Sequence, residues 1–242
     1  MKVLQIILIS LTTLFGCKKN EAKPYVYTDN VNPVKAMTTD SITYLALGDS
    51  YTIGQSVPQA ESYPYQLTAS LSAEGFKTRN PDIIAITGWT TDDLIDAIAA
   101  STFKSKQYSF VTLLIGVNDQ YQGMSQANYT IKFAQVLNTA ISYAQGDPNR
   151  VFVLSIPDYG VTPFADGNDA TIGPQIDQFN KINETISNKA GVHYLNITSI
   201  SRQAANDSQL IAPDGLHPSG IMYGLWVNML EPLVAAQLNK SN

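Results

Sequence analysis

In ITYLALGDS, residues 42–50, an apolar run leads directly into a small polar turn. The run from Ile42 to Leu47 is typical of a buried strand, and Gly48 marks the turn that follows it. Ser50 therefore comes directly after the end of a strand. Because ligands of open α/β folds bind beyond the carboxyl ends of the strands, this stretch predicts a central strand together with a candidate site.

Strands and helices alternate along the rest of the chain. The patterns predict strands at residues 42–47, 82–86, 110–115, 150–155 and 191–196, and helices at residues 63–73, 90–100, 128–144, 176–190 and 220–238. Alternation at this spacing favours parallel strands joined by right-handed helical crossovers. We therefore expect an α/β fold, a three-layer sandwich in which helices cover both faces of a mostly parallel five-stranded sheet.

The composition indicates one folded domain behind a leader. The chain has 242 residues, of which 44% are hydrophobic and 14% charged, enough for one sizeable core and short for two. Its formal charge is -5, and its basic residues form no run beyond the pair Lys18-Lys19. Without a basic field to attract phosphates, we expect no nucleic-acid partner.

The first residues have the pattern of an export signal. Met1 and Lys2 precede a short apolar stretch, residues 3–15, that is too short and too polar for a comfortable membrane span. The stretch ends in LFGC, residues 14–17, which resembles the lipobox of bacterial lipoproteins. In that motif the cysteine, here Cys17, is lipidated and becomes the first residue of the mature chain.

These features predict a lipoprotein signal peptide at residues 1–16, a polar tether at residues 17–41 and the folded domain at residues 42–242. The expected location is the bacterial cell envelope, where the lipid anchor alone would contact the membrane. An exported chain with a single cysteine has no disulfide to explain that residue. The alternatives are a plain signal peptide and a chance buried cysteine.

A serine hydroxyl needs a base to become a nucleophile, and the chain has two histidines. His193 lies within the apolar run of a predicted strand, which favours a packing role. His217 lies in a loop three residues after Asp214, a spacing that lets a carboxylate orient the imidazole and stabilise its cation. We therefore predict Ser50 as nucleophile, His217 as base and Asp214 as its orienting residue.

Acyl transfer also requires donors for the developing oxyanion. Asn118 follows the third predicted strand and carries a side-chain amide, while the backbone N–H groups of Ser50 and Gly88 can supply further donors. For Asp49 and Asp119 we expect structural roles, in which they hold the loop backbone by hydrogen bonds.

Four ordered segments resemble the sequence blocks of the SGNH or GDSL hydrolases. They are GDS at residues 48–50, Gly88, GVND at residues 116–119 and DGLHP at residues 214–218. The resemblance spans nearly the whole domain and implies a flavodoxin-like sandwich with the catalytic and oxyanion roles given above. Two departures are Tyr51, where many members have Leu, and the Gly88 block, which reads ITGWT without the common preceding Asn.

Cofactor chemistry has little support in the sequence. The two histidines lie far apart, and neither a His-x-x-His motif nor a cysteine pair is present. A phosphate-binding interpretation of residues 48–54 lacks the Lys of a P-loop. We expect no metal and no organic cofactor.

The predicted function is a serine esterase that hydrolyses acyl esters through an acyl-serine intermediate, with a short-acyl ester or a carbohydrate ester as partner. The alternatives are a polysaccharide O-acetyltransferase, a lysophospholipase or thioesterase, and a non-catalytic glycan-binding surface lipoprotein.

The longest irregular stretch, residues 157–174, follows the fourth predicted strand and is expected to form one wall of the site. Its apolar residues alternate with acidic ones, which argues against a deep lipid tunnel. Five aromatic residues near strand ends or the histidine loop are candidates for contact with sugars or acyl chains, with packing as the alternative: Trp89, Tyr121, Tyr159, Phe164 and Tyr223.

Overall fold

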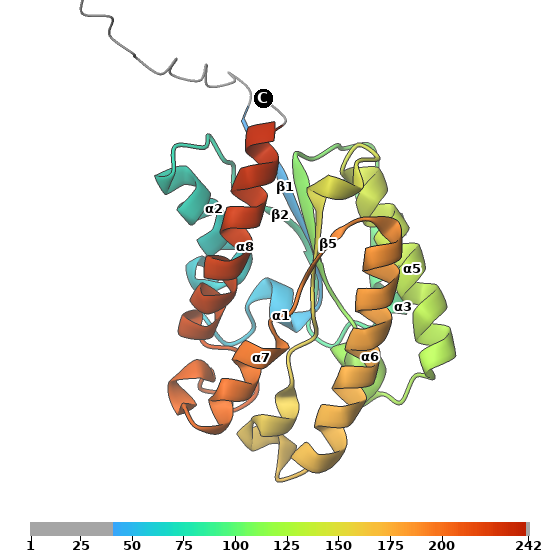
Figure 1. Ribbon diagram of the computed structural model, residues 1–242, viewed down its shortest axis with the longest axis vertical. Coiled ribbons are helices and arrows are strands. Elements are labelled where there is room, and N and C mark those ends of the chain that lie inside the picture. Colours follow the sequence, from blue (N-terminus) through green and yellow to red (C-terminus); the bar gives the residue numbers. More distant parts are fainter. Residues whose placement is uncertain (1–40, 241–242) are drawn as a thin grey trace, which may run out of the picture. The chain divides into compact units, whose positions relative to one another are not determined.

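The central sheet has the predicted architecture. The computed structural model describes residues 41–240 and contains a five-stranded sheet in the order β2-β1-β3-β4-β5 (Figure 1). The strands are β1 (Tyr44–Gly48), β2 (Asp82–Ala85), β3 (Phe110–Leu114), β4 (Val151–Leu154) and β5 (His193–Leu195). All four neighbouring pairs are parallel, which confirms the predicted α/β fold.

Helices cover both faces of the sheet. In Figure 1, α2 and α8 lie on one side of the strands, and α3, α5 and α6 lie on the other. The α-helices are α1 (Ser50–Ile53), α2 (Tyr63–Ala73), α3 (Thr91–Ala100), α4 (Val117–Tyr121), α5 (Gln126–Tyr143), α6 (Asp169–Ala190), α7 (Thr198–Ser201) and α8 (Gly220–Lys240). Short 3-10 helices are η1 (Gln59–Glu61), η2 (Pro148–Arg150), η3 (Tyr159–Val161), η4 (Pro163–Ala165), η5 (Arg202–Ala205) and η6 (Ser208–Leu210).

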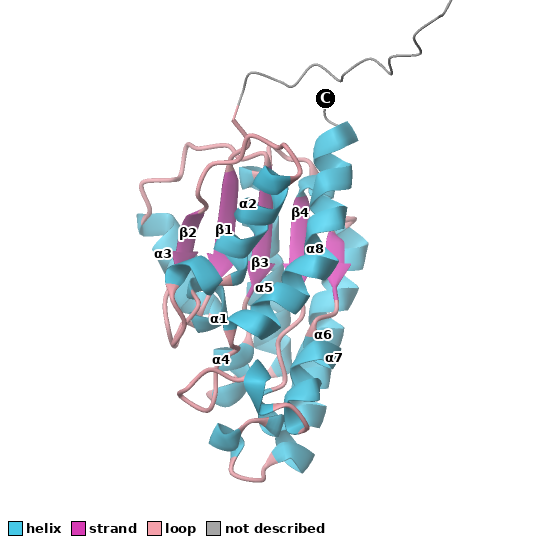
Figure 2. Ribbon diagram, turned by 90° about the vertical axis from the view of Figure 1, so that its left-hand side faces the viewer, coloured by secondary structure: helices cyan, strands magenta, loops and turns pink. Residues whose placement is uncertain are grey.

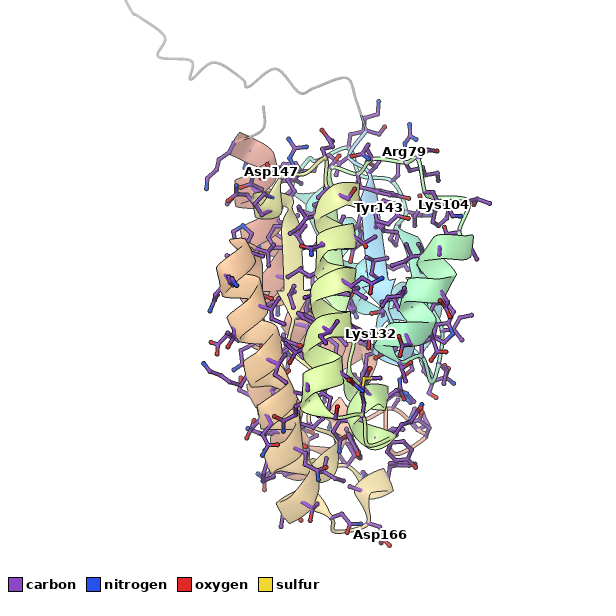
Figure 3. The ribbon with its side chains drawn as sticks, turned by 90° about the vertical axis from the view of Figure 1, so that its right-hand side faces the viewer. Arg79, Lys104, Lys132, Tyr143, Asp147 and Asp166 are labelled. Atoms are coloured by element: carbon purple, nitrogen blue, oxygen red, sulfur yellow. The ribbon has the colours of Figure 1, made fainter. Side chains whose placement is uncertain are left out.

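The core lies where strand side chains meet these helices. All residues of β1, β3 and β4 are buried, as expected for strands covered on both faces. Tyr44 of β1 stacks on Phe110 of β3 with ring centroids 4.3 Å apart. On the outer side, Lys132 of α5 (Figure 3) forms an ion pair with Asp92 of α3 at 2.5 Å, so these neighbouring helices are also linked at the surface.

Local signals account for where several helices begin. Thr90 caps α3, and its side chain and that of Asp93 exchange hydrogen bonds with each other's backbone N–H in a capping box. The predicted start of α6 at residue 176 was wrong, since this helix begins at Asp169 and continues through Pro174. Ile172 and Ile176 are both buried and one turn apart, so packing of that face carries the helix past the proline.

The carboxyl ends of the strands point to one end of the domain, where α1 and α4 lie (Figure 2). None of the helices among residues 41–240 is both long enough and apolar enough to cross a bilayer. The expected signal peptide, Cys17 and the tether up to residue 40 lie outside the described residues, so the structure does not test them.

Candidate active site

The nucleophile turn, residues 48–54, joins β1 to α1 and places Ser50 at the start of that helix. A side chain at Gly48 would put its Cβ 2.3 Å from the carbonyl oxygen of Leu114, so only glycine allows β1 to approach β3 here. Asp49 caps α1 and accepts a hydrogen bond from the Tyr51 N–H at 3.0 Å. Ser50 is 5% exposed and borders a cavity.

The histidine loop, residues 211–218, positions His217 through Asp214. The Oδ1 atom of Asp214 accepts hydrogen bonds from the backbone N–H groups of Leu216 at 2.9 Å and His217 at 3.0 Å. Its Oδ2 atom lies 2.6 Å from His217 Nδ1. This geometry favours the tautomer with a proton on Nδ1, which leaves Nε2 as the basic nitrogen.

The electrostatics of the histidine loop favour a charged Asp214. Partial burial alone raises the pKa of this carboxyl, but hydrogen bonds from Ser56, His217 and two backbone N–H groups outweigh it. The net effect holds the pKa of Asp214 well below its ordinary value, so it is a carboxylate at neutral pH. It can therefore stabilise an imidazolium at His217.

The three candidate oxyanion donors come from adjacent strands. Because β2, β1 and β3 are neighbours in the sheet, the loops that carry Gly88, Ser50 and Asn118 meet at its edge. One N–H of the Asn118 amide donates to the Trp89 carbonyl oxygen at 2.9 Å, which fixes the side chain and leaves the other N–H for a ligand. Gly88 has φ 86° and is exposed.

Asp119 has the structural role that the sequence predicts. Its carboxylate is fully buried and accepts hydrogen bonds from the backbone N–H and the hydroxyl of Thr91. Since Thr91 is the first residue of α3, Asp119 ties the end of the loop that contains Gly88 to α4, the helix that contains Asn118. The relative positions of two candidate donors thus depend on a buried carboxylate.

Ser50, Gly88, Asn118 and His217 all line one cavity of about 180 Å³, and Asp214 lies behind His217. The remaining lining residues are Tyr51, Thr87, Val117, Tyr121, Tyr159, Phe164 and Leu216. The structure therefore brings together all five predicted site residues of the domain. His193, in contrast, stacks on Phe152 with ring centroids 4.7 Å apart, at the start of β5 and away from the cavity.

Three of the five aromatic candidates line the cavity as one cluster. The ring centroids of Tyr121, Tyr159 and Phe164 lie 6.2–6.3 Å from one another. Trp89 packs against the hydrophobic core, and Tyr223 is fully buried beside Trp226 on α8. For these two residues the packing alternative holds.

The loop after β4 contributes a wall of the cavity through Tyr159 and Phe164. Its buried acidic residue, Asp158, is not left unpaired, because Arg202 binds its Oδ2 atom at 2.9 Å. Asp166 lies at the exposed tip of this wall (Figure 3). The stretch expected to be irregular up to residue 174 is shorter than predicted, since α6 already begins at Asp169.

Sequence patterns did not indicate one contact in the site. The hydroxyl of Ser56 donates to Asp214 Oδ2 at 2.6 Å across a separation of 158 positions. A serine in a polar turn carries no signal of so distant a partner.

Among residues 41–240, no three His, Cys, Asp or Glu side chains gather as a metal site requires.

A sequence profile of the GDSL-like lipase/acylhydrolase family matches residues 46–225, and the chain belongs to this family. Membership in this family makes it a hydrolase that acts on ester bonds. Among curated proteins, none matches the sequence.

Solved structures of esterases share the fold. An esterase from Pseudoalteromonas sp. is 20% identical with a TM-score of 0.62, and the match covers 81% of this chain and 98% of that one. A lipase/acylhydrolase from Enterococcus faecalis is 16% identical with a TM-score of 0.63, covering 81% and 96%. An acetyl xylan esterase from Geobacillus stearothermophilus is 15% identical with a TM-score of 0.60, covering 81% and 94%.

Proposed function

We propose that this chain is a serine esterase that works through an acyl-Ser50 intermediate. The observation that carries the proposal is the oriented His217, whose ring is held by Asp214 at 2.6 Å and borders the same cavity as Ser50. Nε2 of His217 takes the proton from the Ser50 hydroxyl as the serine oxygen attacks the ester carbonyl carbon. The histidine then protonates the departing alcohol.

The oxyanion of the tetrahedral intermediate needs preorganised donors. The Ser50 N–H lies in the first turn of α1, where it has no partner within the helix, and the free N–H of Asn118 and the N–H of Gly88 complete the set. Water activated by His217 then attacks the acyl carbon and releases the acid, which restores the Ser50 hydroxyl.

A short acyl group fits the cavity best. The volume of about 180 Å³ is small beside ligand pockets in general, and its aromatic side is lined by Tyr159 and Phe164. Each further buried methylene contributes at most about 0.8 kcal/mol, so the gain stops when the chain leaves the cavity. The aromatic cluster also suits an acetylated sugar, whose ring can pack on the exposed Tyr121.

A series of p-nitrophenyl esters, assayed with the full chain below the micelle concentration, tests this proposal. We expect kcat/KM to peak between acetate and hexanoate and to fall by palmitate. A value that keeps rising to long chains would contradict the short-acyl assignment and favour a lysophospholipase or thioesterase. Acetylated glycans belong in the same screen, as does a glycan acceptor. Acetyl transfer to the acceptor would indicate an O-acetyltransferase, whereas glycan binding without turnover would indicate a non-catalytic lipoprotein.

We also propose that the chain is exported to the cell envelope and anchored through Cys17. The support is the apolar leader and the lipobox-like LFGC at residues 14–17. Intact mass spectrometry of the full-length protein from bacterial membranes should find a lipidated Cys17 as the first residue. Cys17→Ser should remain unprocessed or unlipidated, and a mature wild-type chain that starts elsewhere would exclude the anchor.

A further inference from the structure

Besides His217, the Asp214 carboxylate has a hydroxyl-bearing neighbour, Ser56. Ser56 Oγ lies 2.6 Å from Asp214 Oδ2, the same oxygen that His217 Nδ1 approaches at 2.6 Å. Since a carboxylate only accepts, both groups donate to this one atom. Ser56 belongs to the segment after α1, so its hydroxyl links the nucleophile turn to the histidine loop.

The backbone of Ser56 is unusual for its residue type. Its φ is 67°, a left-handed value shared among residues 41–240 by just two other non-glycine residues, Gln145 and Asp166. Glycine adopts this conformation without strain, whereas serine does not. Glycine would therefore have less backbone strain at this position. What serine adds is its hydroxyl group.

The hydroxyl completes the immobilisation of the Asp214 carboxylate. The backbone N–H groups of Leu216 and His217 fix Oδ1, while Oδ2 contacts side chains alone. Without Ser56, the orientation of Oδ2 would depend on the imidazole that it is meant to orient. The hydrogen bond from Ser56 also contributes to the lowered pKa of Asp214, against the opposing effect of burial.

We propose that Ser56 is a positioning residue that acts through Asp214 on His217 and so extends the candidate triad to a four-residue chain. The proposal rests on the proposed esterase function. Ser56 is not among the residues that line the cavity, so its effect should be on the chemical step and not on ester binding. Because Ser56 is exposed, water replaces part of its hydrogen bond when the hydroxyl is removed, which limits the effect.

Two variants of the full chain separate the hydroxyl from the backbone. Ser56→Gly removes the hydroxyl and suits the φ of 67°, whereas Ser56→Ala removes it and keeps the strain. We expect both to lower kcat about tenfold on p-nitrophenyl butyrate with KM unchanged within about twofold, as for loss of a purely transition-state effect. Gln145→Gly is the matched control, since Gln145 shares the left-handed φ of 62° but lies after α5, and its kcat should stay at the wild-type value.

A double-mutant cycle tests whether Ser56 acts through Asp214. In an Asp214→Asn background, Ser56→Ala should cause no further loss of kcat, because the group that it positions is gone. A full tenfold loss in that background, or a wild-type kcat for Ser56→Gly, would overturn the proposal while the esterase function stands. If Ser50→Ala retained activity, that result would instead contradict the proposed serine esterase function, and the inference about Ser56 would fail with it.

Discussion

The nucleophile turn and the histidine loop each depend on an aspartate, and they use it in opposite ways. Asp49 is fully buried, its Oδ2 atom has no hydrogen-bond partner, and burial raises the pKa of its carboxyl to about 8. Asp214 is partly exposed and accepts several hydrogen bonds, which hold its pKa well below the ordinary value. Asp49 is therefore a largely neutral support at neutral pH, and Asp214 is a charged orienting group. The two residues are of the same type, so their different pKa values come from the number of hydrogen-bond donors around each carboxyl group and from its exposure to water.

The largest expected effect tests whether the two regions act as one unit. Ser50→Ala and His217→Ala should each lower kcat by about a million-fold, and the double variant should be no worse than either. The measurement is kcat on p-nitrophenyl butyrate. His193→Ala is the control, because His193 packs on Phe152 and should affect thermal stability more than kcat. Equal catalytic losses at both histidines would break the assignment of the base.

Next in size is the contrast between the two aspartates. Asp214→Asn should lower kcat by about ten-thousand-fold, since an amide no longer stabilises the imidazolium or selects its tautomer. Asp49→Asn keeps the acceptor for the Tyr51 N–H and replaces a group that is already largely neutral, so its kcat should fall far less. Comparable losses from the two replacements would contradict the different roles of the two residues.

A smaller effect is expected at the oxyanion donor. Asn118→Ala should cost about a hundred- to a thousand-fold in kcat with little change in KM, because such a donor acts mainly in the transition state. Steady-state kinetics on the same ester separate the two parameters. A change confined to KM would make Asn118 a substrate-binding residue.

The smallest effect concerns stability against pH. The pKa of Asp49 lies near its ordinary value of 3.8 in the unfolded chain and at about 8 in the folded one. Between these values the unfolded state binds fewer protons, so the free energy of unfolding should fall as pH rises, by up to about 1.4 kcal/mol per pH unit. Urea unfolding at pH 5, 6.5 and 8 measures this slope.

Asp49→Asn should make that slope shallower. A residual slope is expected, because burial also raises the pKa values of Asp119 and Glu231. An unchanged slope in Asp49→Asn would show that Asp49 is already ionised in the folded protein, and the contrast with Asp214 would then fail.

Sequence patterns predicted the sheet well and the small elements poorly. Strands such as β1 and β3 are buried on both faces, so their apolar runs stand out without tertiary information. The short helices α1 and α4 contain four and five residues, too few to show a helical period. They remained unpredicted even though they carry Ser50 and Asn118.

The residues of the candidate site also differ in how well the sequence predicts them. Ser50, Asn118 and His217 were found because their positions follow strand ends or lie in a marked loop. Ser56 was missed because its partner is distant in sequence, and Tyr223 was not separated from the cavity aromatics. Its neighbours on α8 are apolar on all sides, so the sequence has no face that distinguishes buried from exposed positions.

The hydrogen bond between Ser56 and Asp214 joins segments 158 positions apart, and this distance has a consequence for assembly of the protein. Contacts between such remote segments form late, because the entropy of closing a long loop must be offset first. Strands β1 and β3 pair across a shorter stretch of chain, from Tyr44 to Phe110 at the first pair, so the sheet closes a smaller loop than the contact between the histidine loop and Ser56 does. We therefore expect ester turnover to recover later during refolding than the sheet becomes buried, because turnover also requires the histidine loop to be in place.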